Sequence, residues 1–290
     1  MKHVFVDCVK YAQSLQTFFD HSNEHESLFN FINTMVPEII SSIGNRTIPL
    51  HILGVGSGSG ELDLEILSKI KEEKPDTPIL NEVLEPNSEQ IKLFKERIAN
   101  APNFKNVKFM WHPKTTEEYK QDVKIDNGLR KFDLIHMIQM IYYVKDPYAT
   151  VKFFMSCLAP KGKLVIILLS RDSHWNALYR KHESLLQPNE GFTLDLHSED
   201  IINVLDSMSA KYQTYKIPSE VDITECFLEG SKNVKGVLDI LTEIHDFTNT
   251  APPELKEQIM SDLRSPEFSF ENDGRIFVTT DLVAIVAENR

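Results

Sequence analysis

The chain has 290 residues, of which 41% are hydrophobic and 26% charged, a balance typical of a globular protein with one large domain or a core plus a small addition. Its 43 acidic and 31 basic residues give a formal net charge of −12, which repels nucleic-acid phosphates and anionic membrane surfaces and mildly attracts small cations. We therefore expect no nucleic-acid partner. No segment approaches the roughly 18 apolar residues that cross a bilayer, so we expect no membrane partner either.

Residues 8–43 have the apolar spacing of two helices. The two stretches are interrupted near Ser22, whose hydroxyl is suited to cap the N terminus of the second helix. The apolar face of that second helix consists of Leu28, Phe31, Ile32 and Met35. We expect residues 1–45 to form an N-terminal helical cover that contributes to a substrate site.

Between residues 46 and 170, short β-branched runs alternate with helical periods. This alternation is typical of a parallel sheet with helices on both faces. The strands are expected at 50–55, 79–84, 107–111, 132–138 and 163–169, with helices between them such as 61–71 and 88–99. The pattern predicts an α/β fold whose Rossmann-like core sheet is mostly parallel.

After residue 170 the pattern becomes helical, at 175–182, 198–208 and 237–247, and Ala251-Pro252-Pro253 then breaks the chain. Alternating residues at 275–278 and 282–286 predict a closing antiparallel hairpin. We expect residues 171–265 to form a substrate-binding cover and residues 266–290 to complete the core sheet.

A glycine-rich turn, ILGVGSGSGE at residues 52–61, joins the first core strand to a helix. Glycines let the backbone approach a ligand closely and adopt positive φ, so such a turn cradles a nucleotide-like group. The dinucleotide fingerprint G-x-G-x-x-G is not met, because its third glycine would fall on Ser59 or Glu61. The spacing is that of the G-x-G-x-G turn of Rossmann-like methyltransferases, which bind S-adenosylmethionine. Its glycines are Gly56, Gly58 and Gly60.

Polar residues follow other core strands at the same edge of the sheet. Glu85 ends the second strand, where a carboxylate can accept both ribose hydroxyls of a nucleoside. His136 and Gln139 stand at the end of the fourth strand, where the reacting methyl group would lie. With the helix-turn-strand sequence at 158–166, these features predict a class I S-adenosylmethionine-dependent methyltransferase, whose core is residues 46–170.

Several stretches of the chain make it similar to the histamine N-methyltransferase family. They are Glu24, the glycine turn, NEVLEP at 81–86, HMIQMIYYVKD at 136–146 and TAPP at 250–253. The similarity runs nearly from end to end. Its most specific part is 136–146, which is not expected in an unrelated methyltransferase.

The resemblance implies which residues bind the methyl donor and the acceptor. Donor contacts of the family fall on Gly56, Glu85, Gln90 and Ile138, and a family serine near the adenine is Thr116 here. For the acceptor, the family's carboxylate falls on Glu24, its amide on Gln139, and its aromatic side chains on Phe5, Tyr11, Tyr142, Tyr143 and Trp175.

Three acceptor positions depart from the family. A pocket Trp is Tyr179, a pocket Phe is Ile240 and a substrate-binding Asn is Thr280. These changes leave the methyl donor as predicted, but they leave the exact acceptor open between histamine and a larger imidazole compound such as carnosine.

The expected chemistry requires positioning rather than a strong base. An imidazole with a pKa near ~6.5 is mostly neutral at pH 7 and can attack a methyl group, whereas an aliphatic ammonium with a pKa near ~10.4 cannot. On this reading Glu24 pairs with the ammonium, while Gln139, Tyr142 and Tyr143 position the ring. No residue is obligatory as a catalytic base, and no metal is expected.

Other classes of function are weaker readings of the same residues. HSNEH at 21–25 matches the H-x-x-E-H zinc pattern, but Ser22 should break the helix that would place both histidines on one face. The glycine spacing disfavours an NAD-dependent oxidoreductase. A non-catalytic binding protein with this fold would not need an intact glycine turn together with Glu85 and Gln90.

Cysteine usage bears on the compartment. Cys8, Cys157 and Cys226 are odd in number and widely spaced, which favours reduced thiols over disulfides. The chain also begins without an apolar run of signal length. We expect a cytoplasmic protein, monomeric by default and without an obligate protein partner.

Overall fold

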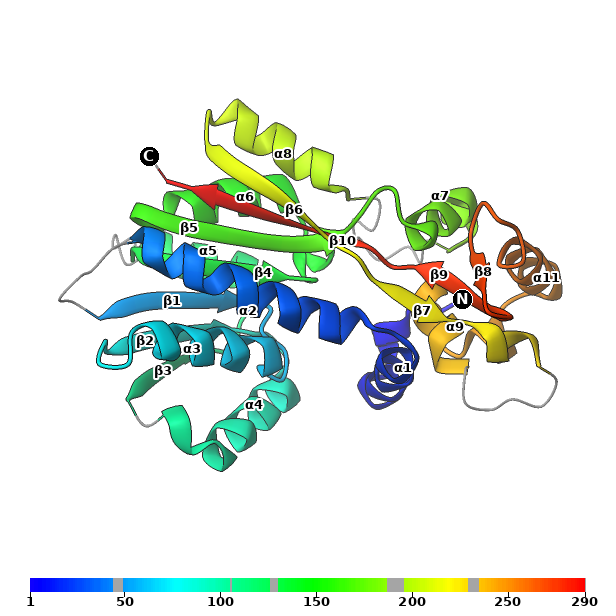
Figure 1. The fold of residues 1–290 in the computed structure, drawn as a ribbon, viewed down its shortest axis with the longest axis horizontal. Helices are drawn as coiled ribbons and strands as arrows, with labels where there is room; N and C mark the ends of the chain where they lie inside the picture. The colour runs from blue at the N-terminus through cyan, green and yellow to red at the C-terminus, as the bar shows by residue number, and fades with distance from the viewer. Residues whose placement is uncertain (44–48, 105, 126–129, 187–195, 229–234, 290) are drawn as a thin grey trace. The chain divides into compact units, whose positions relative to one another are not determined.

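The computed structural model describes residues 1–290 except 44–48, 105, 126–129, 187–195, 229–234 and 290 (Figure 1). Its chain forms two compact units, each built from separate stretches. Unit 1 consists of Met1–Leu28, Leu169–Gly191 and Lys216–Leu282, and unit 2 of Phe29–Leu168, Phe192–Tyr215 and Val283–Arg290. The assignment of donor and acceptor binding to four consecutive segments stays a prediction. Those segments are 1–45, 46–170, 171–265 and 266–290.

Unit 2 is organised around a seven-stranded sheet in the order β3-β2-β1-β4-β5-β10-β6. Strand β1 pairs in parallel with β2 and β4, β2 with β3, and β4 with β5. The carboxyl ends of these strands therefore meet at one edge of the sheet. The strands are β1 Leu50–Val55, β2 Ile79–Leu84, β3 Val107–His112, β4 Phe132–Ile138, β5 Leu158–Leu169, β6 Lys211–Ile217 and β10 Leu282–Glu288.

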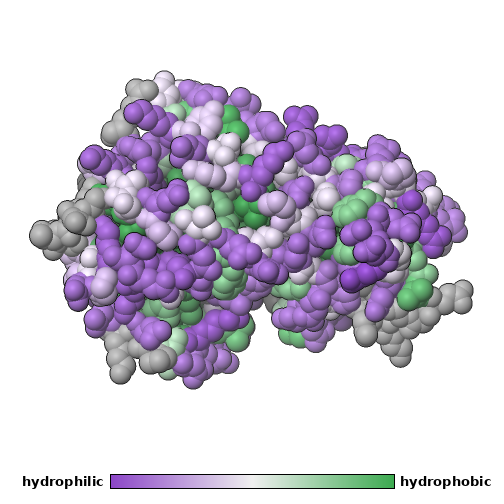
Figure 2. Space-filling model, viewed as in Figure 1, coloured by the Kyte–Doolittle hydropathy of each residue, from purple (hydrophilic) through white to green (hydrophobic). Residues whose placement is uncertain are grey.

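The central strands of this sheet are buried on both faces. Consecutive residues, whose side chains point to opposite faces, are at most 1% exposed in Leu134 and Ile135 of β4 and in Ile166 and Ile167 of β5, as expected for parallel strands covered by helices. The protein face drawn in Figure 2 is mainly hydrophilic.

The helices of unit 2 are α3 Glu61–Glu73, α4 Ser88–Asn100, α5 Thr116–Ile125, α6 Pro147–Ser156 and α8 Ser198–Ser207, with short 3-10 turns at η2 Pro102–Phe104 and η3 Ile141–Tyr143.

The two N-terminal helices form as predicted. Helix α1 spans Cys8–His21 and α2 spans Glu24–Ile43. The Glu24 N–H donates to the Ser22 hydroxyl over 2.9 Å, while the Asn23 carbonyl accepts the first helical hydrogen bond, from the Ser27 N–H. Asn23 therefore holds the N-cap position, and the Ser22 hydroxyl one residue earlier accepts the first N–H of α2.

Unit 1 also contains a three-stranded antiparallel sheet in the order β7-β9-β8. Helix α9 packs against α1 and α7, and α7 also packs against β9. The elements of this unit are η1 Val4–Val6, α7 His174–Leu186, β7 Glu220–Asp222, η4 Thr224–Phe227, α9 Lys235–Thr242, α10 Phe247–Thr250, α11 Pro253–Asp262, β8 Phe270–Asn272 and β9 Arg275–Thr279.

The structure corrects several details expected after residue 160. The strands expected to form a hairpin belong to different sheets: β9 pairs with β7 and β8, whereas β10 lies between β5 and β6. The helix expected over 237–247 is interrupted, because Glu243 and Asp246 adopt positive φ of 55° and 50°. Strand β5 begins earlier than expected, and β6 was not expected. Across the described residues, no helix is long and apolar enough to span a bilayer.

Candidate active site

The glycine turn between β1 and α3 has a backbone conformation that residues other than glycine rarely adopt. Gly56, Gly58 and Gly60 have φ of 66°, 54° and 76°, a left-handed region that favours glycine. A Cβ on Gly56 would lie 2.7 Å from the Met140 Cβ, and one on Gly60 would lie 2.2 Å from the Phe94 ring. The turn therefore needs glycine for both conformation and space.

Glu85 lies against this turn, as its predicted role requires. One carboxylate oxygen accepts the Gly58 N–H and the other accepts the Asn87 N–H, each over 2.9 Å. Burial raises the pKa of Glu85 against the opposing effect of these two donors. A Cβ on Gly58 would lie 3.9 Å from the Gln90 Oε1, so the structure brings Gly58, Glu85 and Gln90 together.

These residues fit the adenosine part of a methyl donor. A carboxylate oxygen has more than one acceptor direction, so Glu85 keeps capacity for ribose hydroxyls while it holds the turn. Thr116 is buried at the start of α5, and its hydroxyl donates to the Glu117 carboxylate over 3.0 Å. Ile138 is the last residue of β4. The roles of Gly56, Gly58, Gly60, Glu85, Gln90, Thr116 and Ile138 toward the donor stay predictions.

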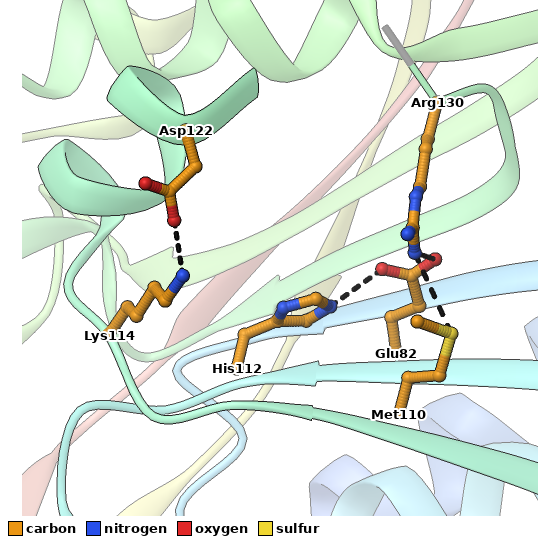
Figure 3. Close-up of polar contacts among 6 residues, drawn as sticks. All are labelled: Glu82, Met110, His112, Lys114, Asp122 and Arg130. Carbon is orange, nitrogen blue, oxygen red and sulfur yellow. Dashed lines mark hydrogen bonds and ion pairs between the residues drawn. The ribbon is translucent and has the colours of Figure 1, made fainter. Parts of the chain in front are cut away.

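A charged cluster of Glu82, His112 and Arg130, which was not predicted from the sequence, lies at the end of β3 next to Glu85 (Figure 3). The Glu82 side chain is 1% exposed and accepts hydrogen bonds from Arg130 over 2.8 Å and from His112 Nε2 over 2.7 Å. The carbonyl of the same His112 accepts the Glu85 N–H over 3.1 Å. Burial opposes ionisation of Glu82, but His112 and Arg130 together hold its pKa below the usual value.

We predict that Glu82→Gln destabilises the protein at pH 7 by about 1–3 kcal/mol, because a buried charge-assisted pair is lost. A lowered folded-state pKa means that this stabilisation is present above the unfolded-state pKa and is lost as the pH falls through the folded value. The difference between wild type and variant should therefore shrink from pH 7 to acid pH in urea unfolding.

The control for this experiment is Asp122→Asn. Asp122 pairs with Lys114 in the same view, but both side chains are at least 40% exposed, so the loss should stay below about 1 kcal/mol. A pH-independent difference for Glu82→Gln would contradict the assigned ionisation.

Gln139 and the tyrosine pair come together after β4. Gln139 has a φ of 51°, and its N–H donates to the Ile167 carbonyl over 2.9 Å. Its side-chain Oε1 accepts the Tyr142 hydroxyl over 2.8 Å. The rings of Tyr142 and Tyr143 are 5.8 Å apart and nearly perpendicular, with Tyr142 buried and Tyr143 exposed. Met140 follows Gln139 and was not predicted as a site residue. Its side chain lies against Gly56.

In unit 1, hydrogen bonds connect the neighbourhoods of Glu24 and Thr280. Glu24 is 4% exposed, and Thr280 is fully buried. Asn23, which precedes Glu24, exchanges hydrogen bonds with the Glu220 backbone over 3.1 and 2.8 Å. Ser219 precedes Glu220, and its hydroxyl lies 2.5 Å from the Thr280 hydroxyl. Ser219 is therefore a further member of this group that sequence reasoning missed.

The remaining acceptor candidates lie on the helices of unit 1. Trp175 donates from Nε1 to the Leu241 carbonyl over 3.0 Å and lies 5.6 Å from Phe18, measured between ring centroids. Tyr179 on α7 and Ile240 on α9 are buried, on helices that pack together. Tyr11 is half-buried on α1. Phe5 belongs to η1, and its side chain lies outside the described residues.

The H-x-x-E-H pattern does not lie on one helix. His21 ends α1, whereas Glu24 and His25 begin α2. The ring of His21 hydrogen-bonds to the Thr17 carbonyl, and the ring of His25 lies 5.1 Å from Phe19. This arrangement removes the helical geometry on which the zinc reading depended.

Comparison with known proteins gives the family. Residues 12–206 match a family model described as a methyltransferase domain. The chain is 46% identical to histamine N-methyltransferase of Xenopus tropicalis, covering 99% of this chain and 98% of that protein. It is 41% identical to the Bos taurus enzyme of the same name, with the same coverage.

The chain belongs to the histamine N-methyltransferase family. Solved structures agree on the fold: YcgJ of Bacillus subtilis has a TM-score of 0.53 at 15% identity, covering 92% of this chain and 99% of that one. The plantazolicin methyltransferase BpumL, solved with S-adenosylhomocysteine (SAH), has a TM-score of 0.51 at 15% identity, covering 99% and 93%. The predicted fold class, enzyme class and donor, S-adenosylmethionine, are confirmed.

Proposed function

We propose that this enzyme transfers a methyl group from S-adenosylmethionine to a ring nitrogen of histamine. The observation that carries the proposal is the buried Glu24 carboxylate, which begins α2 and is joined through Asn23 and Glu220 to the Ser219–Thr280 pair. A buried carboxylate is a partner for an ammonium group that has left water. Relatives that carry histamine N-methyltransferase as their name make histamine the first acceptor to test.

In the proposed reaction the bound donor supplies an electrophilic methyl group on a sulfonium. The lone pair of the neutral ring nitrogen forms the new C–N bond, and the electrons of the broken C–S bond remain on sulfur. The ring then carries the positive charge and loses its other proton to water. Gln139, whose amide is oriented by Tyr142, positions the ring, and in-line alignment provides the main acceleration.

The direct test uses purified protein, methyl-labelled S-adenosylmethionine and histamine. Transfer of label to histamine, with one SAH formed per label transferred, supports the proposal. SAH binding without any transfer to histamine or carnosine would leave a methyltransferase-fold binding protein and contradict the proposal.

A larger imidazole compound such as carnosine is the second candidate. Carnosine N-methyltransferase 2 of Gallus gallus is 41% identical over 280 residues, covering 97% of this chain and 87% of that protein. The resemblance also implies that Tyr179, Ile240 and Thr280 replace a Trp, a Phe and an Asn of the histamine enzymes, which would remove ring area or an amide from the acceptor site. The Thr280 hydroxyl is already engaged by Ser219, which favours a looser hold on the amine.

We predict that the double variant Ile240→Phe, Thr280→Asn has a ratio of kcat/KM for histamine to kcat/KM for carnosine about tenfold or more above that of wild type. The physical reason is that each apolar contact discriminates between acceptors by roughly 1–3 kcal/mol. Both positions are buried, so circular dichroism must first show that the variant is folded. The measurement is the ratio of kcat/KM for the two acceptors. An unchanged ratio in a folded variant would mean that these positions do not line the acceptor site.

The proposal includes a cytoplasmic monomer that needs no protein partner. Cys157 and Cys226 are free thiols, and burial raises the pKa of the Cys157 thiol to about 11, which keeps it protonated and unreactive. Light scattering on the purified protein tests the monomer, and fluorescence microscopy of a tagged chain tests the compartment.

A further inference from the structure

Gly54 lies on β1, just before the glycine turn, and three polar side chains, those of Ser57, Asp63 and His136, lie close to its Cα. A Cβ on Gly54 would lie 2.3 Å from Asp63 Oδ1, 2.3 Å from Ser57 Oγ and 2.9 Å from His136 Cε1. The Ser57 hydroxyl donates to Asp63 over 2.7 Å, and His136 Nε2 lies 3.6 Å from the same carboxylate. Gly54 is therefore the residue that leaves room for this cluster.

The cluster joins the glycine turn to the strand that ends at the acceptor-positioning residues. Ser57 belongs to the turn itself, and Asp63 lies in the first turn of α3. His136 pairs with Gly54 across β1 and β4 and stands three residues before Gln139. The Asp63 and His136 side chains are each 4% exposed, so this contact is screened very little by solvent.

Asp63 also acts electrostatically on Glu85. Burial is the main reason that the pKa of Glu85 is raised, and the negative charge of Asp63 adds to it. Burial likewise raises the pKa of Asp63, against the effects of His136 and Ser57, and it lowers the pKa of His136. Two buried carboxylates therefore contact one glycine turn, Glu85 through the Gly58 N–H and Asp63 through the Ser57 hydroxyl, and such a concentration of negative charge favours a positively charged ligand.

We propose that Asp63 is a specificity residue of the donor site, which favours the positively charged sulfonium of S-adenosylmethionine over the uncharged thioether of SAH. Ser57 and His136 hold its carboxylate in place as positioning residues. Methyl transfer leaves the C–S bonding electrons on sulfur, so the positive charge that Asp63 favours is absent from the product. Release of SAH is thereby favoured. The inference concerns the donor alone and does not depend on the identity of the acceptor.

The test is calorimetric titration of wild type and Asp63→Asn with S-adenosylmethionine and with SAH. Asparagine keeps the size and one oxygen acceptor for Ser57 but removes the charge. The ratio of the dissociation constant for S-adenosylmethionine to that for SAH should rise by about threefold to tenfold, the effect of one charge at a moderate distance in a partly polarisable interior. Asp63→Glu, which restores the charge, should return the ratio toward wild type.

Ser57→Ala is the matched control, because it removes the hydrogen bond to Asp63 and keeps the charge. It should weaken both ligands by similar factors and leave their ratio within about twofold of wild type, as loss of one neutral hydrogen bond predicts. An equal loss for both ligands in Asp63→Asn, or no loss, would overturn the proposal and leave Asp63 as a structural residue of the helix terminus. If circular dichroism shows that Asp63→Asn does not fold, Asp63→Ser provides the same charge removal in a smaller side chain.

Discussion

Glu24→Gln should lower kcat/KM for histamine by about 30-fold to several thousand-fold, because leaving a desolvated ammonium without its charged partner costs roughly 2–5 kcal/mol. The side chain is buried at the start of α2, where glutamine keeps the shape. Affinity for SAH should stay unchanged. If the contact is equally strong in the ground and transition states, the loss appears in KM rather than in kcat.

Two controls separate binding of the ammonium from damage to the helix. Glu26→Gln changes an exposed acid in the same helical turn and should leave kcat/KM for histamine within about twofold of wild type, since exposed charges contribute little. The acceptor 4-methylimidazole has the ring without the amine, so Glu24→Gln should affect its methylation far less than that of histamine. Equal losses for both acceptors would show that Glu24 does not pair with the ammonium.

Features set by local sequence were predictable for this chain. Strands β1, β2 and β4 begin and end at the expected residues, because short runs rich in β-branched and other apolar residues, bounded by turn residues, indicate buried parallel strands. The glycine turn and Glu85 were also predictable, since the carboxyl ends of parallel strands meet at one edge. Their contact through the Gly58 N–H follows from that topology.

Pairings between distant segments were not predictable from one sequence. The alternating strands β9 and β10 looked alike and close enough for a hairpin, yet they join different sheets, because period-two alternation identifies a strand but not its partner. Strand β6 was missed, since most of its residues are polar and remain at least partly exposed.

The same limit applies to the polar clusters. Arg130 reaches Glu82 across 48 positions of sequence, and Thr280 reaches Ser219 across 61. Asp63 looked like an ordinary acid near a helix N terminus, and only the fold places it against His136. These groups could be recognised only once the sheet register and the loop paths were known.

Glu85→Ala should weaken binding of both S-adenosylmethionine and SAH by at least about tenfold, because two charge-assisted hydrogen bonds to the ribose contribute roughly 1.5–3 kcal/mol each before relaxation. The variant should stay folded, and calorimetric titration measures the change. Both ligands should lose affinity alike, since they share the ribose. This common loss distinguishes Glu85 from Asp63, whose replacement should change the ratio of the two affinities.

The structure adds a second reason for this loss and a way to separate the two. Glu85 also accepts the Gly58 and Asn87 N–H groups, so alanine removes support for the turn as well as the predicted ribose contact. Glu85→Gln keeps one carbonyl acceptor and should lose less affinity than Glu85→Ala, whereas the exposed Glu89→Gln on the first turn of α4 should lose none. A ligand that ends at adenine, without ribose, should bind wild type and Glu85→Gln equally. Unchanged SAH affinity in Glu85→Ala would place the ribose away from the end of β2, because neither the charge nor the support of the glycine turn would then contribute to donor binding.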